Sequence, residues 1–294
     1  MEITWQNKDG KEQSLKRFLR KRGVSQRLYR KLQNGFGAVK LDGQKVQLAT
    51  TVPKNATVKL CLPAEGPDET VEPSFAPIDV IYEDKYWLVV NKEAGLTSVP
   101  GPSNRTDTLV NRVKGYLQQK NAFDQAPRII TRLDRYTSGL VLFAKHSFAQ
   151  AQIATQVSSH LMDKRYLALV TGEIKEKHGF IEGPIARKEN DVKYLIDPAG
   201  KPAKSEYWCE AKNAELSLVQ VKLHTGRTHQ IRVHFSENGH PLLGDKLYGG
   251  SRSLIARQAL HAYRLSFDDP FSQKKLSFTA PVPADMEKVI TQAF

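Results

Sequence analysis

A carboxylate between two arginines is the residue best suited for chemistry in this sequence. Asp134 follows Arg132-Leu133 and precedes Arg135, and apolar, strand-like runs flank this polar stretch on both sides. A loop held by strands at both ends presents a side chain rigidly. A neighbouring cation keeps a carboxylate ionised at neutral pH, so that it can act as a nucleophile or a base. An aspartate in such a loop more often serves as a turn or capping residue. The position alone therefore predicts no reaction.

The residues that follow Asp134 give it a more specific context. Residues 132–145 read RLDRYTSGLVLFAK, a polar loop that runs into an apolar strand and ends in Ala-Lys. This string resembles the active-site motif of the RluA/RluD-type pseudouridine synthases. The resemblance implies an enzyme that cleaves the glycosidic bond of a uridine in RNA, rotates the uracil and joins C5 to the sugar.

Further segments resemble the same family in the same order along the chain. The resemblance covers about residues 78–285, and its motifs include residues 82–96 (YEDKYWLVVNKEAGL), 164–172 (KRYLALVTG) and 225–234 (TGRTHQIRVH), then a Gly-His-Pro and a Gly-Asp pair, and finally Leu-His-Ala at 260–262. Two residues depart from the pattern. Thr131 stands where the family commonly has His, and Glu93 stands where Pro usually follows Asn-Lys. Neither replaces a catalytic group, so they bear on the RNA target more than on the reaction.

The resemblance implies a role for each catalytic residue. Asp134 attacks the sugar or removes a sugar proton, and the sequence leaves both open. Tyr166 faces the uracil and is the base that removes the C5 proton. Arg227 pairs with Asp134 and keeps it ionised, with Arg232 as the alternative partner. The isomerisation needs no redox step and no energy input, so we expect no cofactor.

Three residues are expected to contact the substrate. A uridine inside a stem must be flipped out to react, and Arg132 is expected to fill the space it leaves. Arg232 and His229 are expected to contact the RNA. His229 also belongs to a group of four histidines that raises the question of a metal, but no HExxH or HxH pair occurs. We expect structural or RNA-contacting roles and no metal site. The group comprises His224, His229, His234 and His240.

The elements that must position these residues predict an α+β domain over residues 78–294. Strand-like segments outnumber helical ones and most connections are short, which favours a mixed, mainly antiparallel sheet with flanking helices. We expect strands at 166–170 and 216–223 and a hairpin within 78–92. Ser147 is expected to cap a helix that runs to about His160, and Thr228 to cap one that ends near Gly239.

A small N-terminal domain is expected over residues 12–62. Between Lys11 and Lys40 there are ten basic residues and one acidic residue, out of 44 and 31 in a chain of net charge +13. Two short basic helices, with Gly23 ending the first and Ser25 capping the second, precede a hairpin with an Asp-Gly turn. This order resembles the S4-type RNA-binding domain. It implies an RNA-docking surface that includes Arg17, Arg20, Lys21, Arg27, Arg30 and Lys31.

The rest of the sequence sets the organisation and the setting. Residues 63–77 hold four prolines and four acidic residues and predict a semi-extended linker. Two distant cysteines, Cys61 and Cys209, suggest neither a disulfide framework nor a zinc ribbon and favour a cytoplasmic protein. The sequence shows no signal peptide and no apolar stretch long enough to cross a membrane. A monomer is the default expectation.

The excess of positive charge favours a polyanionic partner, with nucleic acid as the first candidate, and the resemblance implies that it is RNA. The resemblance favours ribosomal RNA of the large subunit, because members of the family with an S4-like domain mostly resemble enzymes of that RNA. Transfer RNA is the alternative. A non-catalytic RNA-binding factor for ribosome assembly is a further alternative from another functional class. The intact Asp134, Tyr166 and Arg227 argue against that last alternative.

Overall fold

A ten-stranded sheet organises most of the chain in the computed structural model, which describes residues 1–66, 69–102 and 104–294. The sheet follows the order β12-β15-β16-β11-β17-β10-β8-β7, with β9 paired to β10 and β18 to β17. These pairings are antiparallel except for β10 with β17. The strands are β7 (Asp79–Glu83), β8 (Trp87–Lys92), β9 (Arg128–Ile129), β10 (Ser138–Ala144), β11 (Asp163–Thr171), β12 (His178–Glu182), β15 (Lys204–Lys212), β16 (Leu216–Leu223), β17 (Leu260–Asp268) and β18 (Lys275–Thr279).

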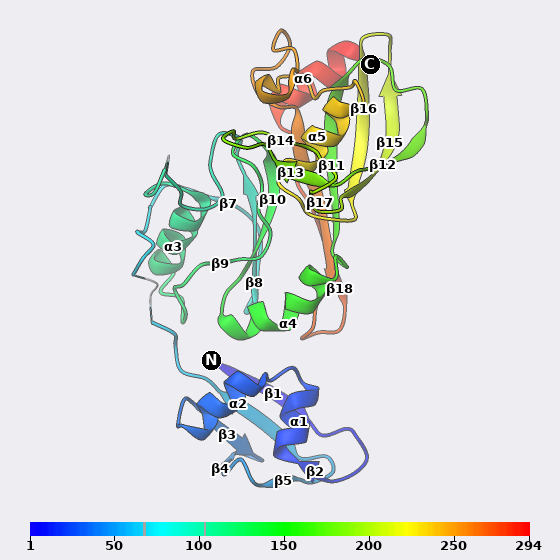
Figure 1. The fold of residues 1–294 in the computed structure, drawn as a ribbon. Helices are drawn as coiled ribbons and strands as arrows, with labels where there is room; N and C mark the ends of the chain where they lie inside the picture. Colours follow the sequence, from blue (N-terminus) through cyan, green and yellow to red (C-terminus); the bar gives the residue numbers. More distant parts are fainter. Residues whose placement is uncertain (67–68, 103) are drawn as a thin grey trace.

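Helices flank this sheet, and the predicted α+β class with a mixed, mainly antiparallel sheet is confirmed (Figure 1). A separate hairpin and a short 3-10 turn lie near α5. No helix of the described residues is long and apolar enough to span a bilayer. The elements are α3 (Leu109–Gln119), α4 (Ser147–Ser158), α5 (Gln230–Glu237), α6 (Ala284–Ala293), β13 (Ile185–Arg187), β14 (Tyr194–Ile196) and the turn η1 (Lys246–Tyr248).

Strand β10 lies in the centre of the sheet and is buried along its whole length. Its alternate side chains enter two different hydrophobic clusters, with Val141 and Phe143 in one and Leu140 and Leu142 in the other. A continuous apolar run is typical of a strand that is covered on both faces. The loop that carries Asp134 therefore leads directly into the most buried strand of the domain.

Gly139 allows the parallel contact between β10 and β17. It pairs with Ala262, and a Cβ built on Gly139 would lie 2.3 Å from the Ala262 carbonyl oxygen. The φ angle of Gly139 is +114°, which L side chains rarely adopt. A glycine is required at this point for both reasons, and it fixes the start of β10 against β17.

The N-terminal residues form a smaller unit with its own sheet and its own hydrophobic cluster. Strand β1 pairs with β6 along its full length. This pairing extends the unit to residue 2, so the predicted start at residue 12 is too late. The elements are β1 (Glu2–Gln6), β2 (Gln13–Ser14), α1 (Leu15–Lys21), α2 (Gln26–Gln33), β3 (Ala38–Leu41), β4 (Gln44–Val46), β5 (Thr51–Val52) and β6 (Thr57–Cys61).

Local signals set the elements of this unit as expected. Helix α1 ends before Gly23, and the Ser25 side chain caps α2 by accepting a hydrogen bond from the Leu28 amide. Asp42 and Gly43 connect β3 to β4, and both have positive φ. Two positive φ angles are what a type I′ hairpin turn requires. The predicted hairpin with its Asp-Gly turn is therefore confirmed.

Two predicted helix caps are wrong. Helix α4 is capped by His146, whose ring Nδ1 accepts a hydrogen bond from the Ala149 amide at 2.9 Å, so Ser147 is already its first residue. The helix ends at Ser158. Helix α5 begins at Gln230 after a left-handed residue, and its side-chain cap from Thr228 is not made. The Gln230 side chain organises this loop instead, because its Oε1 accepts hydrogen bonds from residues 225 and 227.

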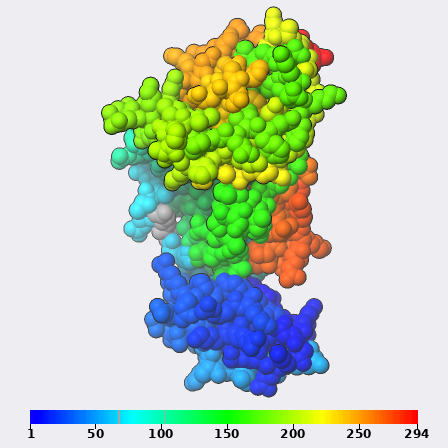
Figure 2. Space-filling model, turned by 45° about the vertical axis from the view of Figure 1, so that its right-hand side comes forward, coloured from blue at the N-terminus to red at the C-terminus, as the bar shows by residue number. Residues whose placement is uncertain are grey.

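The N-terminal unit lies at one end of the molecule and the C-terminus at the other (Figures 1 and 2). The unit packs on α4, where Phe148 enters its hydrophobic cluster beside Trp5. Gln152 also donates a hydrogen bond to the Arg22 carbonyl at 3.1 Å. The described part of the predicted linker runs past α3, and Asn111 of that helix binds the carbonyl of Glu72 at 2.7 Å. Residues 67 and 68 lie outside the described residues.

Candidate active site

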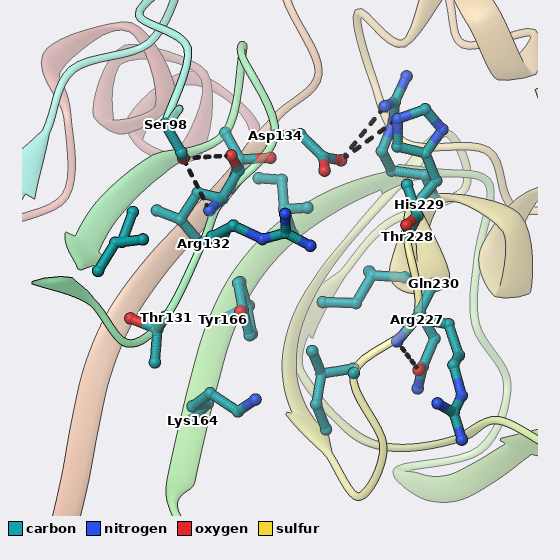
Figure 3. A pocket seen from close by; sticks show the side chains of 18 of the residues that line it. Ser98, Thr131, Arg132, Asp134, Lys164, Tyr166, Arg227, Thr228, His229 and Gln230 are labelled. Atoms are coloured by element: carbon teal, nitrogen blue, oxygen red, sulfur yellow. Dashed lines mark hydrogen bonds and ion pairs between the residues drawn. The ribbon is translucent and has the colours of Figure 1, made fainter. Parts of the chain in front are cut away.

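A pocket of about 670 Å³ opens beside Asp134. Segments far apart in the sequence form its walls: the loop before β10, the start of β11, and the loop that leads into α5 (Figure 3). The pocket brings together every predicted site residue from residues 78–294. These are Arg132, Asp134, Tyr166, Arg227, His229 and Arg232. The six predicted cations of the N-terminal unit do not line it.

The loop that carries Asp134 is fixed on both sides of the residue. Ser98 accepts a hydrogen bond from the Leu133 amide at 3.1 Å and donates one to the Leu133 carbonyl at 2.6 Å. After Asp134, the Thr137 amide donates to the Asp134 carbonyl at 3.1 Å, and Gln258 donates to the Thr137 hydroxyl at 2.8 Å. The sequence analysis missed Ser98 because no local pattern links it to residue 133.

A buried lysine also holds this loop. The Lys92 ammonium donates hydrogen bonds to the carbonyls of Glu93, Leu96 and Arg135 at 2.8, 2.9 and 3.1 Å. Burial lowers the pKa of Lys92 to about 7, while the charge of Asp134 opposes this shift. Lys92 belongs to the Asn-Lys motif that the sequence analysis identified without a function. In the structure it joins the turn at Gly95 to the loop that carries Asp134.

Arg232 makes the ion pair that was expected of Arg227. The Arg232 Nη1 lies 3.3 Å from Asp134 Oδ2. The Arg227 guanidinium points away from Asp134 and donates to the Pro202 carbonyl at 3.0 Å (Figure 3). The predicted pairing of Arg227 is therefore wrong, and the alternative is correct. The physical reason is that Arg227 precedes α5, whereas Arg232 projects from within it.

Arg232 is itself held by a second carboxylate. Its Nε and Nη2 donate to the two oxygens of Asp245 at 2.6 and 2.9 Å, a bidentate pair that fixes the plane of the guanidinium. Burial lowers the pKa of Arg232, but its bonds to Asp245 outweigh this effect and raise it. Its carbon Cζ lies 4.8 Å from the ring centre of Tyr248. The cation therefore faces Asp134 in one defined orientation.

His229 is the second polar group beside Asp134. Its Nε2 lies 3.9 Å from Asp134 Oδ2, and its Nδ1 lies 2.9 Å from the Tyr248 hydroxyl. Burial lowers the pKa of His229, although the charge of Asp134 raises it in part. The neutral imidazole is thus favoured at neutral pH. His229 has a left-handed backbone with a φ of +56°, which places the ring in the pocket ahead of α5.

Tyr166 forms the floor of the pocket on β11. It lies where the pairing of β11 with β17 shifts in register between residues 165 and 167. A register shift of this kind changes the direction in which a side chain points. Burial, and then the charge of Asp134, raise the pKa of the Tyr166 phenol. The ring is therefore a neutral phenol at neutral pH.

Arg132 and Lys164 border the pocket, and neither forms an ion pair among the described residues. Arg132 is exposed and projects across the pocket towards the space above Tyr166 (Figure 3). Lys164 lies on β11 one residue before the strand's Arg165, and burial lowers its pKa. The sequence analysis did not single out Lys164, although its place two residues before Tyr166 on the same face of a strand could have indicated it.

The four histidines identified in the sequence have separate surroundings in the structure. No group of three or more possible ligands occurs in the described part of the chain. His234 is fully buried against Ser205 and His240 binds the Thr171 carbonyl, while His224 binds Glu206. Each therefore has a separate structural contact. Of these four histidines, only His229 lines the pocket.

The comparisons with known proteins agree with this geometry. The family model described as RNA pseudouridylate synthase matches residues 86–237. An RNA pseudouridine synthase of Bacillus subtilis, YjbO, is 35% identical over 94% of this chain and 98% of its own. Ribosomal large subunit pseudouridine synthase D of Zymomonas mobilis is 38% identical over 79% of this chain and 76% of its own.

A solved structure shows the same fold. Human RNA pseudouridylate synthase domain containing 1 superimposes with a TM-score of 0.59 at 25% identity, over 76% of this chain and 97% of its own. The matched region contains Asp134, Tyr166 and Arg232, which line the pocket. The chain therefore belongs to the RNA pseudouridine synthase family, the isomerases that convert uridine to pseudouridine in RNA.

Proposed function

We propose that this enzyme isomerises specific uridines of large-subunit ribosomal RNA and that Asp134 is its catalytic carboxylate. The observation that carries the proposal is the position of Asp134 in the pocket, on a loop fixed at both ends and beside a buried arginine. The ribosomal target is supported by similarity to proteins named ribosomal large subunit pseudouridine synthase D in two bacteria.

Asp134 acts on the sugar of the bound uridine, as a nucleophile at C1′ or as a base towards a sugar proton. Either step uses the negative charge that the Arg232 guanidinium stabilises at 3.3 Å. The reaction is redox-neutral, and the proton lost from C5 is balanced by one gained at N1. We therefore propose that it proceeds without a cofactor or a metal ion.

Tyr166 contacts the uracil from below. A nearly buried aromatic ring on a strand is a suitable surface for stacking a base. Its raised pKa disfavours the phenolate that a proton acceptor would need. This supports a stacking role for the Tyr166 ring more than a role as the base for the C5 proton.

Arg132 fills the space that the flipped-out uridine leaves in the RNA. The nucleotide must leave its stack to reach Asp134, at a cost of a few kcal/mol. An exposed guanidinium at the pocket entrance can stack on the neighbouring bases and offset part of this cost. Arg227 and His229 complete the polar wall on the opposite side of the pocket.

The N-terminal unit docks RNA as an S4-like domain. Arg17, Arg20, Lys21, Arg27, Arg30 and Lys31 are all exposed on α1 and α2. Only Lys21 forms an ion pair within the described residues, with Asp9 at 2.8 Å. The others are available to phosphates, which bind such cations with release of counterions.

We also propose that the enzyme is a monomer and acts in the cytoplasm.

Replacing Asp134 with Asn tests the catalytic assignment. The amide keeps the size of the side chain but carries no negative charge, so turnover should fall by at least about 10⁴-fold. Tritium release from RNA labelled at uridine C5 measures turnover, and filter binding measures RNA affinity. Affinity should change little. Retained turnover in Asp134→Asn would remove the carboxylate from the mechanism.

The target can be identified by mapping pseudouridines in cells with and without the gene. We expect the loss of one or a few sites in large-subunit ribosomal RNA. Loss of sites only in transfer RNA would replace the ribosomal target. Complementation with Asp134→Asn is the matched control, because a lost site should not return.

A further inference from the structure

Both groups that face Asp134 are held by the same short turn. Arg232 is fixed by the carboxylate of Asp245, and His229 by the hydroxyl of Tyr248 at 2.9 Å. Asp245 caps the 3-10 turn η1 and Tyr248 ends it. The two contacts on the catalytic carboxylate therefore depend on residues only three positions apart.

The hydrogen bonds of Tyr248 decide which nitrogen of His229 carries the proton. The Tyr248 hydroxyl already accepts a hydrogen bond from the Tyr194 amide at 2.9 Å. If it also accepted one from His229, its own proton would have no acceptor among the described residues, and Tyr248 is 9% exposed. A buried donor without a partner is costly. The hydroxyl therefore donates to His229 Nδ1, and the ring proton lies on Nε2, facing Asp134.

This arrangement engages one oxygen of the carboxylate and leaves the other. Arg232 Nη1 and His229 Nε2 both approach Oδ2 of Asp134, at 3.3 and 3.9 Å. Oδ1 has no hydrogen-bond partner among the described residues. Arg232 donates a hydrogen bond to Oδ2, and the His229 N–H faces the same oxygen from 3.9 Å, beyond hydrogen-bond distance. Both groups attract Oδ2, so they favour the rotation of the carboxylate that leaves Oδ1 free for the substrate.

We propose that His229 is a positioning residue for Asp134 and that Tyr248 holds it in the Nε2–H tautomer. The inference rests on the proposed role of Asp134 in catalysis. It gives His229 a role other than contact with the RNA. It also connects the site to the β13–β14 hairpin through Tyr194 of β14. The Tyr194 amide donates to the Tyr248 hydroxyl, and the centre of the Tyr194 ring lies 5.4 Å from that of the His229 ring.

Substitutions at both positions test the connection in the full-length enzyme. Tyr248→Phe removes only the hydroxyl and keeps the ring that lies against Arg232. His229→Asn removes the ring with a residue that tolerates the left-handed backbone. Each should lower kcat by about tenfold at unchanged KM. The double variant should be no slower than His229→Asn, because Tyr248 acts through His229.

Tyr82→Phe is the matched control. It also deletes a tyrosine hydroxyl, which donates to Asp84 at 2.9 Å, and this tyrosine lies outside the pocket. Its kcat should equal that of the unmodified enzyme. Multiplicative losses in the double variant, a rise in KM alone, or equal behaviour of Tyr248→Phe and Tyr82→Phe would overturn the proposal.

The tautomer provides a readout that does not depend on activity. Nitrogen NMR of protein labelled in histidine should show the proton of His229 on Nε2, and Tyr248→Phe should shift the Nδ1 resonance. A proton on Nδ1 would overturn the proposal, whatever the rates. If the tautomer is as expected but Asp134→Asn still turns over, the proposed function fails while the geometry of His229 stands.

Discussion

The charged residues of the N-terminal unit and those of the pocket differ in burial and in pairing. On α1 and α2, the six candidate cations are exposed, and five of them form no ion pair within the described residues. At the pocket, Arg232 is 7% exposed at its side chain and contacts two carboxylates. The same type of side chain is thus free to bind a polyanion in one region and locked in one orientation in the other.

We expect this difference to separate the residues that set RNA affinity from those that set the rate of the reaction. Exposed cations gain little from any single internal partner and are available to phosphates. A buried guanidinium needs partners, and its partners then define where it points. We expect changes in the pocket to act on kcat and changes in the N-terminal unit to act on RNA affinity. Three sets of substitutions, at Arg232, at Tyr166 and on the N-terminal unit, test whether the pocket sets the rate and the N-terminal unit sets the affinity.

The largest effect is expected for Arg232→Lys. A lysine keeps the charge but cannot form the bidentate pair with Asp245 while it contacts Asp134. The value of kcat should fall by about 100-fold with little change in RNA affinity. Arg227→Lys is the matched control and should stay within about threefold of the unmodified enzyme. Single-turnover kinetics and filter binding separate the two quantities. A larger loss for Arg227→Lys would reverse the assignment of the two arginines.

A smaller effect is expected for Tyr166→Phe. The phenylalanine keeps the ring that we propose to stack on the uracil and removes only a hydroxyl that is protonated at neutral pH, so kcat should fall by about tenfold. Tyr166→Ala should cost more, since the stacking surface is lost. Tritium release from labelled RNA measures both variants. If Tyr166→Phe is as inactive as Asp134→Asn, the phenol is the proton acceptor after all.

The smallest effect per residue is expected in the N-terminal unit. Replacing Arg17, Arg27 and Arg30 with Gln should weaken RNA binding by about tenfold at unchanged kcat. The slope of log affinity against log salt should become shallower by about 0.9 for each lost phosphate contact. Filter binding across a salt series measures both. Substitution is preferable to deletion of the unit, because deletion would expose Phe148.

A charge-matched control is available elsewhere on the surface. Lys274, Lys275 and Lys288 are exposed and lie outside the pocket and the N-terminal unit. Their replacement with Gln changes the net charge by the same amount. If both triple variants lose the same affinity, the N-terminal cations contribute only through the overall charge of the protein.

Local signals account for most of the fold that the sequence predicted. The Asp42-Gly43 turn, the Ser25 cap and the apolar run of β10 each depend on neighbouring residues, and the structure has all three. The cap of α4 was misassigned for a similar local reason. His146 and Ser147 are adjacent, both can accept a hydrogen bond, and only the backbone geometry decides between them.

The sequence by itself determined the type of chemistry. The string around Asp134, the order of the later motifs and the block of basic residues predicted the family, the RNA partner and most of the pocket. The tertiary structure decided which side chains of the site contact one another. Arg232 rather than Arg227 faces Asp134 because α5 turns it there and Asp245 holds it. Ser98, Lys92 and Tyr248 support the site across contacts between distant segments, and spacing along a chain does not encode such contacts.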